Sequence, residues 1–263
     1  MAPNTKLDDM TIRVAVVGAT GKLGSAATAL LERTDGFEVV ARLGSTSELA
    51  EMLGAGDAAS DVVLDVTLPQ VSPTVVEYAV THGRNVVVGT SGWSAERLAG
   101  LTTLLARHPE RGVVVIPNFS LGSALGTAFA AAASRFFDAI EIVETHGAGK
   151  VDSPSGTAVR TAELIQAARG DLGPVSAPHI DQRARGQQVG SVPIHSLRLP
   201  GVSARQEVTF GAEGETLVIS HNVIGASAYS AGILLALRAA AERTGLTVGL
   251  DALVDLGIAP GER

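Results

Sequence analysis

The chain contains 263 residues, of which 46% are hydrophobic and 18% are charged, and its formal net charge is −7. This composition is typical of a folded globular protein with one large domain or two smaller ones, and the acidic charge argues against nucleic acid or an anionic membrane surface as the main partner. The chain has no cysteine, which excludes disulfides, thiolate metal ligands and thiol nucleophiles.

The first ten residues, MAPNTKLDDM, are polar and acidic and have no apolar core of the signal-peptide type. No apolar run in the sequence approaches the roughly 18 residues that a membrane-spanning helix needs. We therefore expect residues 1–10 to form a loose arm and the protein to be soluble and cytoplasmic. No metal site is predicted.

Short β-branched runs alternate with helical segments up to residue 120. The predicted strands are 12–17, 37–42, 62–67, 85–88 and 112–116. A helix is expected from the glycine-rich turn after the first strand to about residue 33, and another begins near Pro73 and ends before Gly83. Continuous Val and Ile runs separated by helices indicate strands that are buried on both faces. The pattern predicts an α/β fold with a parallel sheet covered by helices.

The pattern changes after residue 118. Helices are predicted over 123–137, 157–169 and 228–243, and strands over 139–144, 192–199, 204–210 and 217–221. The last three strands have hairpin-like spacing and predict a mixed or antiparallel sheet. Residues 170–190 have no clear period, so an extended or mobile connection is expected there. We expect the last helix to fold back onto the first sheet.

A glycine-rich loop follows the first strand directly and precedes a helix. Glycines in such a loop allow a tight turn and let backbone N–H groups approach a pyrophosphate at the start of the helix. A plain β–α turn is the alternative, but the surrounding strand–helix–strand pattern favours dinucleotide binding. The candidate cofactor-binding residues are Gly18, Thr20, Gly21, Lys22, Leu23 and Gly24.

The end of the second strand reads Arg42-Leu43-Gly44-Ser45-Thr46-Ser47. NAD-binding folds usually place an acidic residue there to bond the ribose 2′-hydroxyl, and this segment has none. An arginine with nearby hydroxyl groups suits a 2′-phosphate, which favours NADPH slightly over NADH. Alternatively, Arg42 is a surface residue and the backbone reads the ribose.

Further candidates lie at the end of the third predicted strand and in the short segments that follow the fourth and fifth strands. Because the carboxyl ends of parallel strands face the ligand crevice, these residues are additional candidates for binding the cofactor. The alternative is that the segments after the strands are ordinary turns, in which such residues are common. They are Thr67, Gly89, Thr90, Pro117, Asn118 and Phe119.

The stretch EIVETHGAGKVDSPSGTA, residues 141–158, combines groups suited to an anionic ligand. His146 is able to give a proton near neutral pH, and Lys150 supplies a positive charge. Ser155-Gly156-Thr157 offers hydroxyl and N–H donors at a helix start. Residues 147–149 are too small to block a ligand. The alternatives are a solvated lysine, an exposed histidine and simple helix capping.

Residues of this stretch match the signature of dihydrodipicolinate reductase, and the sequence is similar to that family over almost its whole length. The matching positions are Glu141, Ile142, Glu144, His146, Lys150, Asp152, Pro154, Ser155, Gly156, Thr157 and Ala158. The resemblance implies reduction of the cyclic product of dihydrodipicolinate synthase by NADH or NADPH, on the diaminopimelate and lysine pathway. It also implies a Rossmann-type dinucleotide-binding domain over 1–120, completed by 227–263, and a central α+β domain with a mixed sheet over 121–226 for substrate binding and assembly into a homotetramer.

Carried over by motif position, the resemblance gives His146 and Lys150 catalytic roles. His146 would donate the proton, and Lys150 would bind a substrate carboxylate or share the acid role. Ser155-Gly156-Thr157 would hold a carboxylate of the dicarboxylate substrate. The nicotinamide would lie near Gly89 and Thr90, with Ser91 reaching the substrate.

The sequence departs from the family pattern in two places. Many relatives have histidine or basic residues where this chain has Gly147, Ala148 and Gly149, and many carry an arginine near 225–227 that is absent here. These departures leave two alternatives open. One is a related nicotinamide-dependent reductase of another cyclic imine or dicarboxylate, and the other is a catalytically weak nucleotide-binding homologue.

Overall fold

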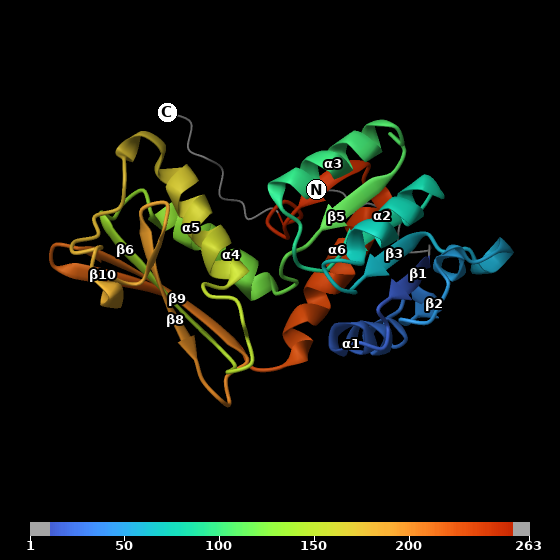
Figure 1. The fold of residues 1–263 in the computed structure, drawn as a ribbon, viewed down its shortest axis with the longest axis horizontal. Coiled ribbons are helices and arrows are strands. Elements are labelled where there is room, and N and C mark those ends of the chain that lie inside the picture. Colours follow the sequence, from blue (N-terminus) through green and yellow to red (C-terminus); the bar gives the residue numbers. More distant parts are fainter. Residues whose placement is uncertain (1–10, 255–263) are drawn as a thin grey trace. The chain divides into compact units, whose positions relative to one another are not determined.

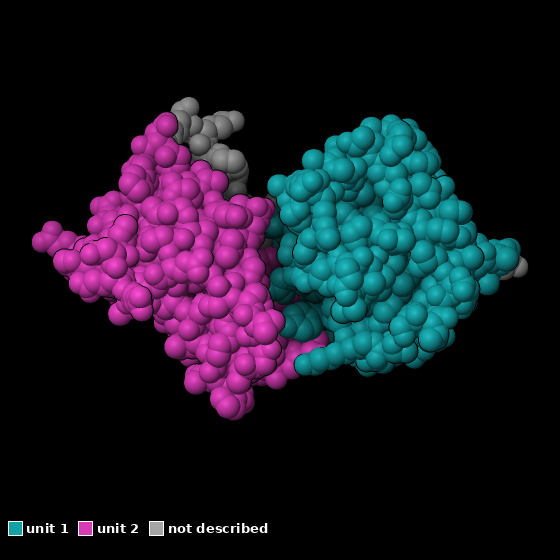
Figure 2. Space-filling model, viewed as in Figure 1, with its two compact units in different colours: residues 1–119, 229–255 teal, residues 120–228, 256–263 magenta. Residues whose placement is uncertain are grey.

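The computed structural model describes residues 11–254. The expected arm at 1–10 and the end of the predicted 227–263 segment lie outside the described residues. Within them the chain forms two compact units, one of residues 11–119 and 229–254 and the other of residues 120–228 (Figure 2).

The first unit contains a six-stranded sheet in which all neighbouring strands are parallel. Its spatial order is β11-β5-β4-β3-β1-β2. Strands β1, β2, β3 and β5 of this sheet are labelled in Figure 1. The strands are β1 (Ile12–Val17), β2 (Phe37–Leu43), β3 (Val62–Asp65), β4 (Asn85–Val88), β5 (Gly112–Val115) and β11 (Gly245–Val248). The predicted Rossmann-type parallel sheet is confirmed. The short last strand, β11, was not predicted.

Helices cover both faces of this sheet because its strands are apolar at successive positions. Val86 and Val88 of β4 belong to one core with α2 and α3, whereas Val87, also fully buried, points to the opposite face. The last helix, α6, lies next to α1 and packs on the sheet as expected. The helices of this unit are α1 (Lys22–Leu31), α2 (Ser72–Thr81), α3 (Ala95–Ala106) and α6 (Ser230–Glu242), with short 3₁₀ helices η1 (Leu49–Leu53) and η2 (Gly56–Ala58).

The strand order reverses at β1. The chain passes from β1 to β2 on one side and then to β3 on the other side. Dinucleotides bind outside the carboxyl ends of the strands at such a switch point. The loops that follow β1 and β3 therefore meet where a cofactor site is expected.

The second unit contains a five-stranded mixed sheet in the order β10-β9-β6-β8-β7 (Figure 1). The strands are β6 (Ala139–His146), β7 (Gln187–Val189), β8 (Val192–Arg198), β9 (Ala204–Ala212) and β10 (Glu215–Val223). The other elements are α4 (Leu121–Ala133), α5 (Gly156–Arg169), η3 (Gly170–Leu172), η4 (Arg183–Arg185) and η5 (Ala226–Tyr229). Ala130 of α4 and Ile165 of α5 pack against Ile142, Ile194 and Phe210 in one core. The predicted mixed sheet is confirmed.

Three details of this unit differ from the sequence expectation. The strands β9 and β10 form the expected hairpin, but β8 pairs with β6 and β7 instead of with β9. The connection expected to be irregular contains η3, η4 and β7. His146, expected on a loop, is the last residue of β6.

Candidate active site

The loop after β1 packs closely on the loop after β3. Gly18 has a φ of +91°, and a Cβ at this position would lie 2.6 Å from the carbonyl oxygen of Val66. A Cβ at Gly24 would lie 2.0 Å from the carbonyl oxygen of Gly18. Only glycine therefore permits this arrangement of loop and helix. Gly21 is the N-cap of α1 and makes no side-chain cap, so the helix start presents backbone N–H groups.

The loops after β4 and β5 also touch each other. A Cβ at Gly89 would lie 2.4 Å from the ring of Phe119, so glycine is required by the aromatic ring. The N–H of Gly89 donates to the carbonyl oxygen of Asp65 at 2.8 Å, and the Thr90 hydroxyl donates to the same oxygen at 3.4 Å. The side chain of Thr67 is bonded to the carboxylate of Asp65 at 2.6 Å.

Most of the predicted cofactor-binding residues thus lie at one edge of the sheet. Several of them are exposed and accessible to a ligand, and these are Thr20, Gly21, Lys22 and Pro117; Ser91, predicted to reach the substrate, is exposed at the same edge. Leu23, Thr67 and Asn118 are half-buried, whereas Gly24, Thr90 and Phe119 are buried beneath them. The exposed residues form the surface that a ligand is able to contact, whereas the buried residues pack beneath this surface and fix the conformation of the loops.

Arg42, the predicted determinant of NADPH binding, lies near the end of β2 and forms an ion pair with Glu32. Glu32 is the C-cap of α1, and both side chains are about half exposed. The sequence places no acidic residue next to Arg42, but the fold brings Glu32 into contact with it. A bound 2′-phosphate would have to share or replace this partner.

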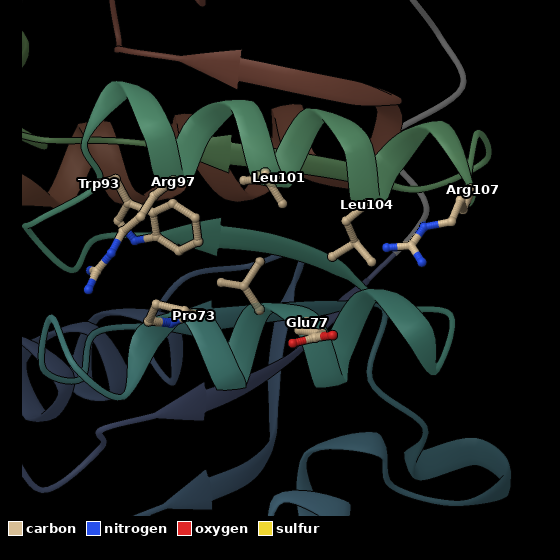
Figure 3. A pocket seen from close by; sticks show the side chains of 9 residues that line it. Pro73, Glu77, Trp93, Arg97, Leu101, Leu104 and Arg107 are labelled. Atoms are coloured by element: carbon tan, nitrogen blue, oxygen red, sulfur yellow. The ribbon is translucent and has the colours of Figure 1, made fainter.

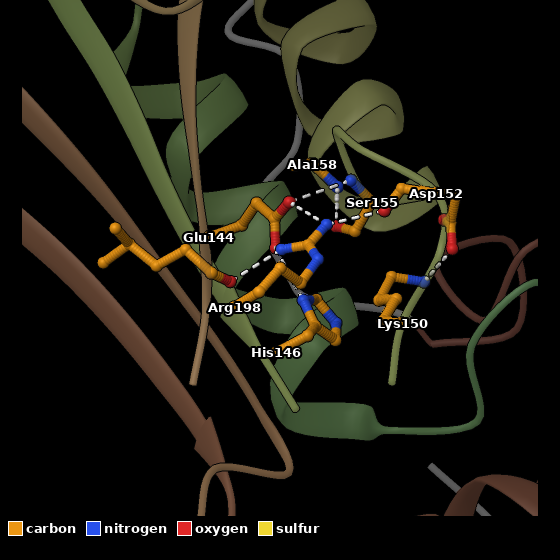
Figure 4. A network of polar contacts seen from close by, with 8 residues as sticks. Glu144, His146, Lys150, Asp152, Ser155, Ala158 and Arg198 are labelled. Carbon is orange, nitrogen blue, oxygen red and sulfur yellow. Dashed lines mark hydrogen bonds and ion pairs between the residues drawn. The ribbon is translucent and has the colours of Figure 1, made fainter. Parts of the chain in front are cut away.

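In the second unit the carboxylate of Glu144 holds the candidate residues together (Figure 4). Arg198 of β8 donates from Nη1 to Oε2 and from Nη2 to Oε1, both at 2.9 Å. His146 lies with Nδ1 2.6 Å from Oε2, and the N–H of Ser155 donates to Oε1 at 3.2 Å. Two strands and the start of α5 therefore meet at one carboxylate with no exposed surface.

The charge state of Glu144 follows from its partners. Burial alone would raise the pKa of this carboxyl, but hydrogen bonds from Arg198, Ser196 and His146 outweigh it and hold the pKa below the usual value. An ionised carboxylate only accepts hydrogen bonds, so Nδ1 of His146 carries the hydrogen between them. Nε2 of His146 is then the atom that gives or takes a proton.

Lys150 pairs with a carboxylate of its own segment. Its Nζ lies 2.7 Å from Oδ1 of Asp152, and this hydrogen bond lowers the pKa of Asp152. The carbonyl oxygen of Asp152 accepts a hydrogen bond from Arg198 Nη2 at 2.6 Å, which ties the segment to β8. The side chain of Asp152 is 56% exposed, so a ligand carboxylate is able to compete with it for the lysine.

The predicted carboxylate-binding turn forms the start of α5. Ser155 is buried, and its Oγ accepts a hydrogen bond from the N–H of Ala158 at 3.2 Å, which makes it the N-cap. Because the N–H of Ser155 is bonded to Glu144, its hydroxyl hydrogen is the donor left for a ligand. A Cβ at Gly156 would contact nothing within 4 Å, so packing within the protein does not impose this glycine. The open space leaves room for a ligand at the helix start.

The small loop of residues 147–149 is only partly constrained. A Cβ at Gly147 would lie 3.1 Å from the carbonyl oxygen of Val202, whereas one at Gly149 would contact nothing within 4 Å. Larger side chains therefore have space at Gly149 but little at Gly147.

Several charged residues of these networks had no assigned role from the sequence. Glu144 stood in the signature without a role, and Arg198 and Asp65 were not singled out. The signal for Glu144 was its place in a strand of alternating pattern, where a charged residue falls among apolar neighbours. Arg198 carried no comparable signal, because its partner lies 54 residues away.

A separate cavity of about 280 Å³ lies between α2 and α3 (Figure 3). Leu101 and Leu104 line its apolar part, and Trp93, Arg97 and Arg107 lie around it. None of the predicted site residues lines this cavity, so it is distinct from both candidate sites.

Over residues 11–254 there is no helix long and apolar enough to cross a membrane. The same part of the chain contains no group of three or more histidine or acidic residues arranged to hold a metal ion.

Two family models together match nearly all of the described chain. The model of the dihydrodipicolinate reductase N-terminus matches residues 12–119, and the model of the C-terminus matches residues 122–254. The chain belongs to the dihydrodipicolinate reductase family. The resemblance based on residues 141–158 is thereby confirmed.

Individual members of the dihydrodipicolinate reductase family are similar along most of their length. A 4-hydroxy-tetrahydrodipicolinate reductase from Clavibacter sepedonicus is 60% identical over 247 residues, covering 94% of this chain and 87% of the relative. One from Streptomyces griseus subsp. griseus is 44% identical over 251 residues, covering 93% and 98%. The structure of dipicolinate-bound dihydrodipicolinate reductase from Paenisporosarcina sp. TG-14 has 30% identity and a TM-score of 0.77, covering 93% of this chain and 100% of that one.

The Glu144 carboxylate makes a testable contribution to stability. We expect Glu144→Gln to lower the free energy of unfolding at pH 7 by about 3 kcal/mol, because it leaves the guanidinium of Arg198 without its charged partner. The folded pKa of Glu144 is depressed, so this contribution is present above about pH 4.5 and is lost as the pH falls through the folded value. Urea unfolding between pH 7 and pH 3 should show a smaller pH dependence in the variant.

Glu207→Gln is the matched control, because Glu207 pairs with the exposed Arg205 on the same sheet. This surface pair should contribute no more than about 1 kcal/mol. If the two substitutions lowered the free energy of unfolding equally, the buried Glu144 carboxylate would contribute no more than a surface ion pair, and this prediction would be wrong.

Proposed function

We propose that this protein reduces 4-hydroxy-tetrahydrodipicolinate to tetrahydrodipicolinate with NADPH or NADH, in diaminopimelate and lysine biosynthesis. The observation that carries the proposal is the cluster in which one buried carboxylate holds His146, Arg198 and the Ser155 turn. The names of the relatives that share most of this chain support the same activity.

The first unit is proposed as the cofactor-binding domain. The start of α1, with the glycine loop before it, would hold the pyrophosphate through backbone N–H groups. Thr67, Gly89 and Thr90 would lie at the nicotinamide end of the cofactor, and Asn118 and Phe119 would border it. When bound, the cofactor supplies a hydride.

The second unit is proposed as the substrate-binding domain. Lys150 would exchange its bond with Asp152 for one to a substrate carboxylate, since both partners are charged oxygen acceptors. The Ser155 hydroxyl and the N–H groups at the start of α5 would bind the second carboxylate, with the open space at Gly156 admitting it. A structure of a 30% identical relative is described as dipicolinate-bound, which supports a dicarboxylate as the kind of ligand.

We assign the donation of the proton in this reaction to His146. Loss of the 4-hydroxyl group as water leaves a conjugated imine, which then accepts one hydride and one proton. Glu144 accepts the hydrogen bond from Nδ1, so Nε2 would hold the proton that is given up. Binding both carboxylates fixes the ring relative to these groups, which lowers the barrier by positioning. Ser91, exposed after β4, is proposed to contact the substrate.

We propose that the protein is a cytoplasmic homotetramer assembled through the second unit. One face of its sheet packs on α4 and α5, while the other carries Val218, which is 49% exposed, and Leu197, which is 47% exposed. Glu141 lies opposite Thr209 on this same face, where it binds His195 at 2.7 Å and pairs with Arg185. Apolar side chains beside fixed ion pairs suit an interface between copies of the chain.

A coupled assay tests the proposed function. The substrate is generated in situ by dihydrodipicolinate synthase, and the loss of nicotinamide absorbance is followed with NADPH and with NADH. We expect oxidation that depends on both the synthase and this protein. Absence of oxidation with either cofactor would exclude the proposed reaction.

The two proposed catalytic residues should be distinguishable by their kinetics. We expect His146→Gln to lower kcat by about 10²-fold or more with little change in KM, because a proton donor acts in the chemical step. Lys150→Ala should raise KM by about tenfold or more and also lower kcat, because it removes a charged hydrogen bond to the substrate. Steady-state kinetics with both cofactors measure this, and unchanged values in either variant would refute that role.

Arg42 provides the test of cofactor preference. We expect Arg42→Ala to raise KM for NADPH about three- to tenfold and to leave KM for NADH nearly unchanged, because only NADPH carries a 2′-phosphate. Arg33→Ala is the matched control, since it removes the same charge from an exposed position beside Glu32. Equal effects of Arg42→Ala on the two cofactors would show that this residue does not bind the phosphate.

A further inference from the structure

Asp65, the last residue of β3, is a fully buried acid that has no cationic partner among the described residues. Other acids whose pKa is held low by their contacts have such a partner. These pairs are Asp61 with Arg13, Glu141 with Arg185, Glu144 with Arg198 and Asp152 with Lys150. Asp65 differs from them because its carboxyl is hydrogen-bonded by the neutral groups of Thr67 and Ser72.

The hydrogen bonds of Asp65 are those of an ionised carboxylate. Oδ1 accepts from the N–H of Thr67 at 3.1 Å and from its hydroxyl at 2.6 Å. Oδ2 accepts from the hydroxyl of Ser72. Ser72 Oγ in turn accepts from Nε1–H of Trp93 at 3.0 Å, and an indole nitrogen only donates, so the serine hydrogen is directed to Asp65. All three donors thus find an acceptor on the carboxylate.

These bonds join three segments at the carboxyl edge of the sheet. The side chain of Asp65 holds the loop after β3 and the first residue of α2, and its carbonyl oxygen accepts from Gly89 and Thr90 of the loop after β4. Because the Thr67 hydroxyl gives its hydrogen to Asp65, its oxygen lone pairs remain available to a donor at the edge. A group bonded to Thr67 therefore lies only two hydrogen bonds from the buried carboxylate.

The charge of this carboxylate is poorly compensated. Burial raises the pKa of Asp65, and the hydrogen bonds from Ser72 and Thr67 oppose this effect only in part. A buried anion without a cation stabilises any positive charge that binds close to it, since the interaction is weakly screened there. The nicotinamide ring is neutral in the reduced cofactor and positively charged in the oxidised cofactor.

We propose that Asp65 is a positioning residue for the nicotinamide end of the cofactor, where its buried charge favours the oxidised form over the reduced form. The proposal rests on the cofactor site assigned above. Asp65 fixes the loops that carry Thr67 and Thr90, and it also sets the relative affinity of the site for the two redox forms.

Asp65→Asn tests the proposal, because it removes the charge and keeps the size of the side chain. Dissociation constants for NADPH and NADP⁺ are measured by titration calorimetry on the full chain, with folding checked by circular dichroism. We expect NADP⁺ binding to weaken at least about tenfold and NADPH binding to weaken by a clearly smaller factor. An unchanged ratio of the two constants in a folded variant would overturn the proposal.

Two control variants distinguish an effect of the Asp65 charge from an effect of loop structure. Asp61→Asn removes a charge just before the opposite end of the same strand, where Asp61 pairs with Arg13, and should leave the ratio unchanged. Ser72→Ala removes one hydrogen bond to the carboxylate but keeps its charge, so it should preserve the ratio even where both affinities fall. If Ser72→Ala altered the ratio as strongly as Asp65→Asn, loop structure would explain the effect and the proposal would be wrong.

A reciprocal measurement needs no variant. By linkage, a cofactor form favoured by the Asp65 charge must lower the pKa of that carboxyl. The carbon-13 carboxyl resonance of Asp65 in the labelled wild-type chain should titrate at lower pH with NADP⁺ than with NADPH, and identical titrations would overturn the proposal. If the wild-type chain binds neither form, the cofactor site itself is wrong; if it binds both and the titrations coincide, only the role of Asp65 is wrong.

Discussion

A carboxylate with no exposed surface must find donors within the protein, and Glu144 imposes this requirement on the second unit. Its donors come from the end of β6, the end of β8 and the start of α5. These contacts fix the histidine ring, the arginine and the turn before α5 with respect to one another. The geometry of the candidate substrate site therefore depends on one buried charge and its complete set of partners.

In the first unit, close contacts at glycine residues bring the loops of the candidate cofactor site together. Gly18 lies against Val66, and Gly89 lies against Phe119, so loops from different strands come together where side chains would keep them apart. Parallel strands place all these loops at one edge of the sheet. Asp65 connects them through hydrogen bonds from Thr67 and Ser72, and among residues 11–254 no cation pairs with its carboxyl.

The sequence predicted those parts of the structure that depend on local pattern. Buried Val runs predicted the parallel strands, and residues 141–158 identified the family. Contacts set by tertiary pairing were not predictable in this way. The short link between β8 and β9 resembles a hairpin loop, yet β6 lies between them, and its parallel register with β8 brings Arg198 to Glu144. Glu32 meets Arg42 only because α1 packs beside β2.

The hydrogen bond from Trp93 to Ser72 has a spectroscopic consequence. The chain contains a single tryptophan, so its indole emission comes from one known place. That indole donates to the hydroxyl group that donates in turn to Asp65. Since indole emission responds to local polarity and hydrogen bonding, the protein carries its own fluorescent reporter at the loops where the nucleotide is expected to bind.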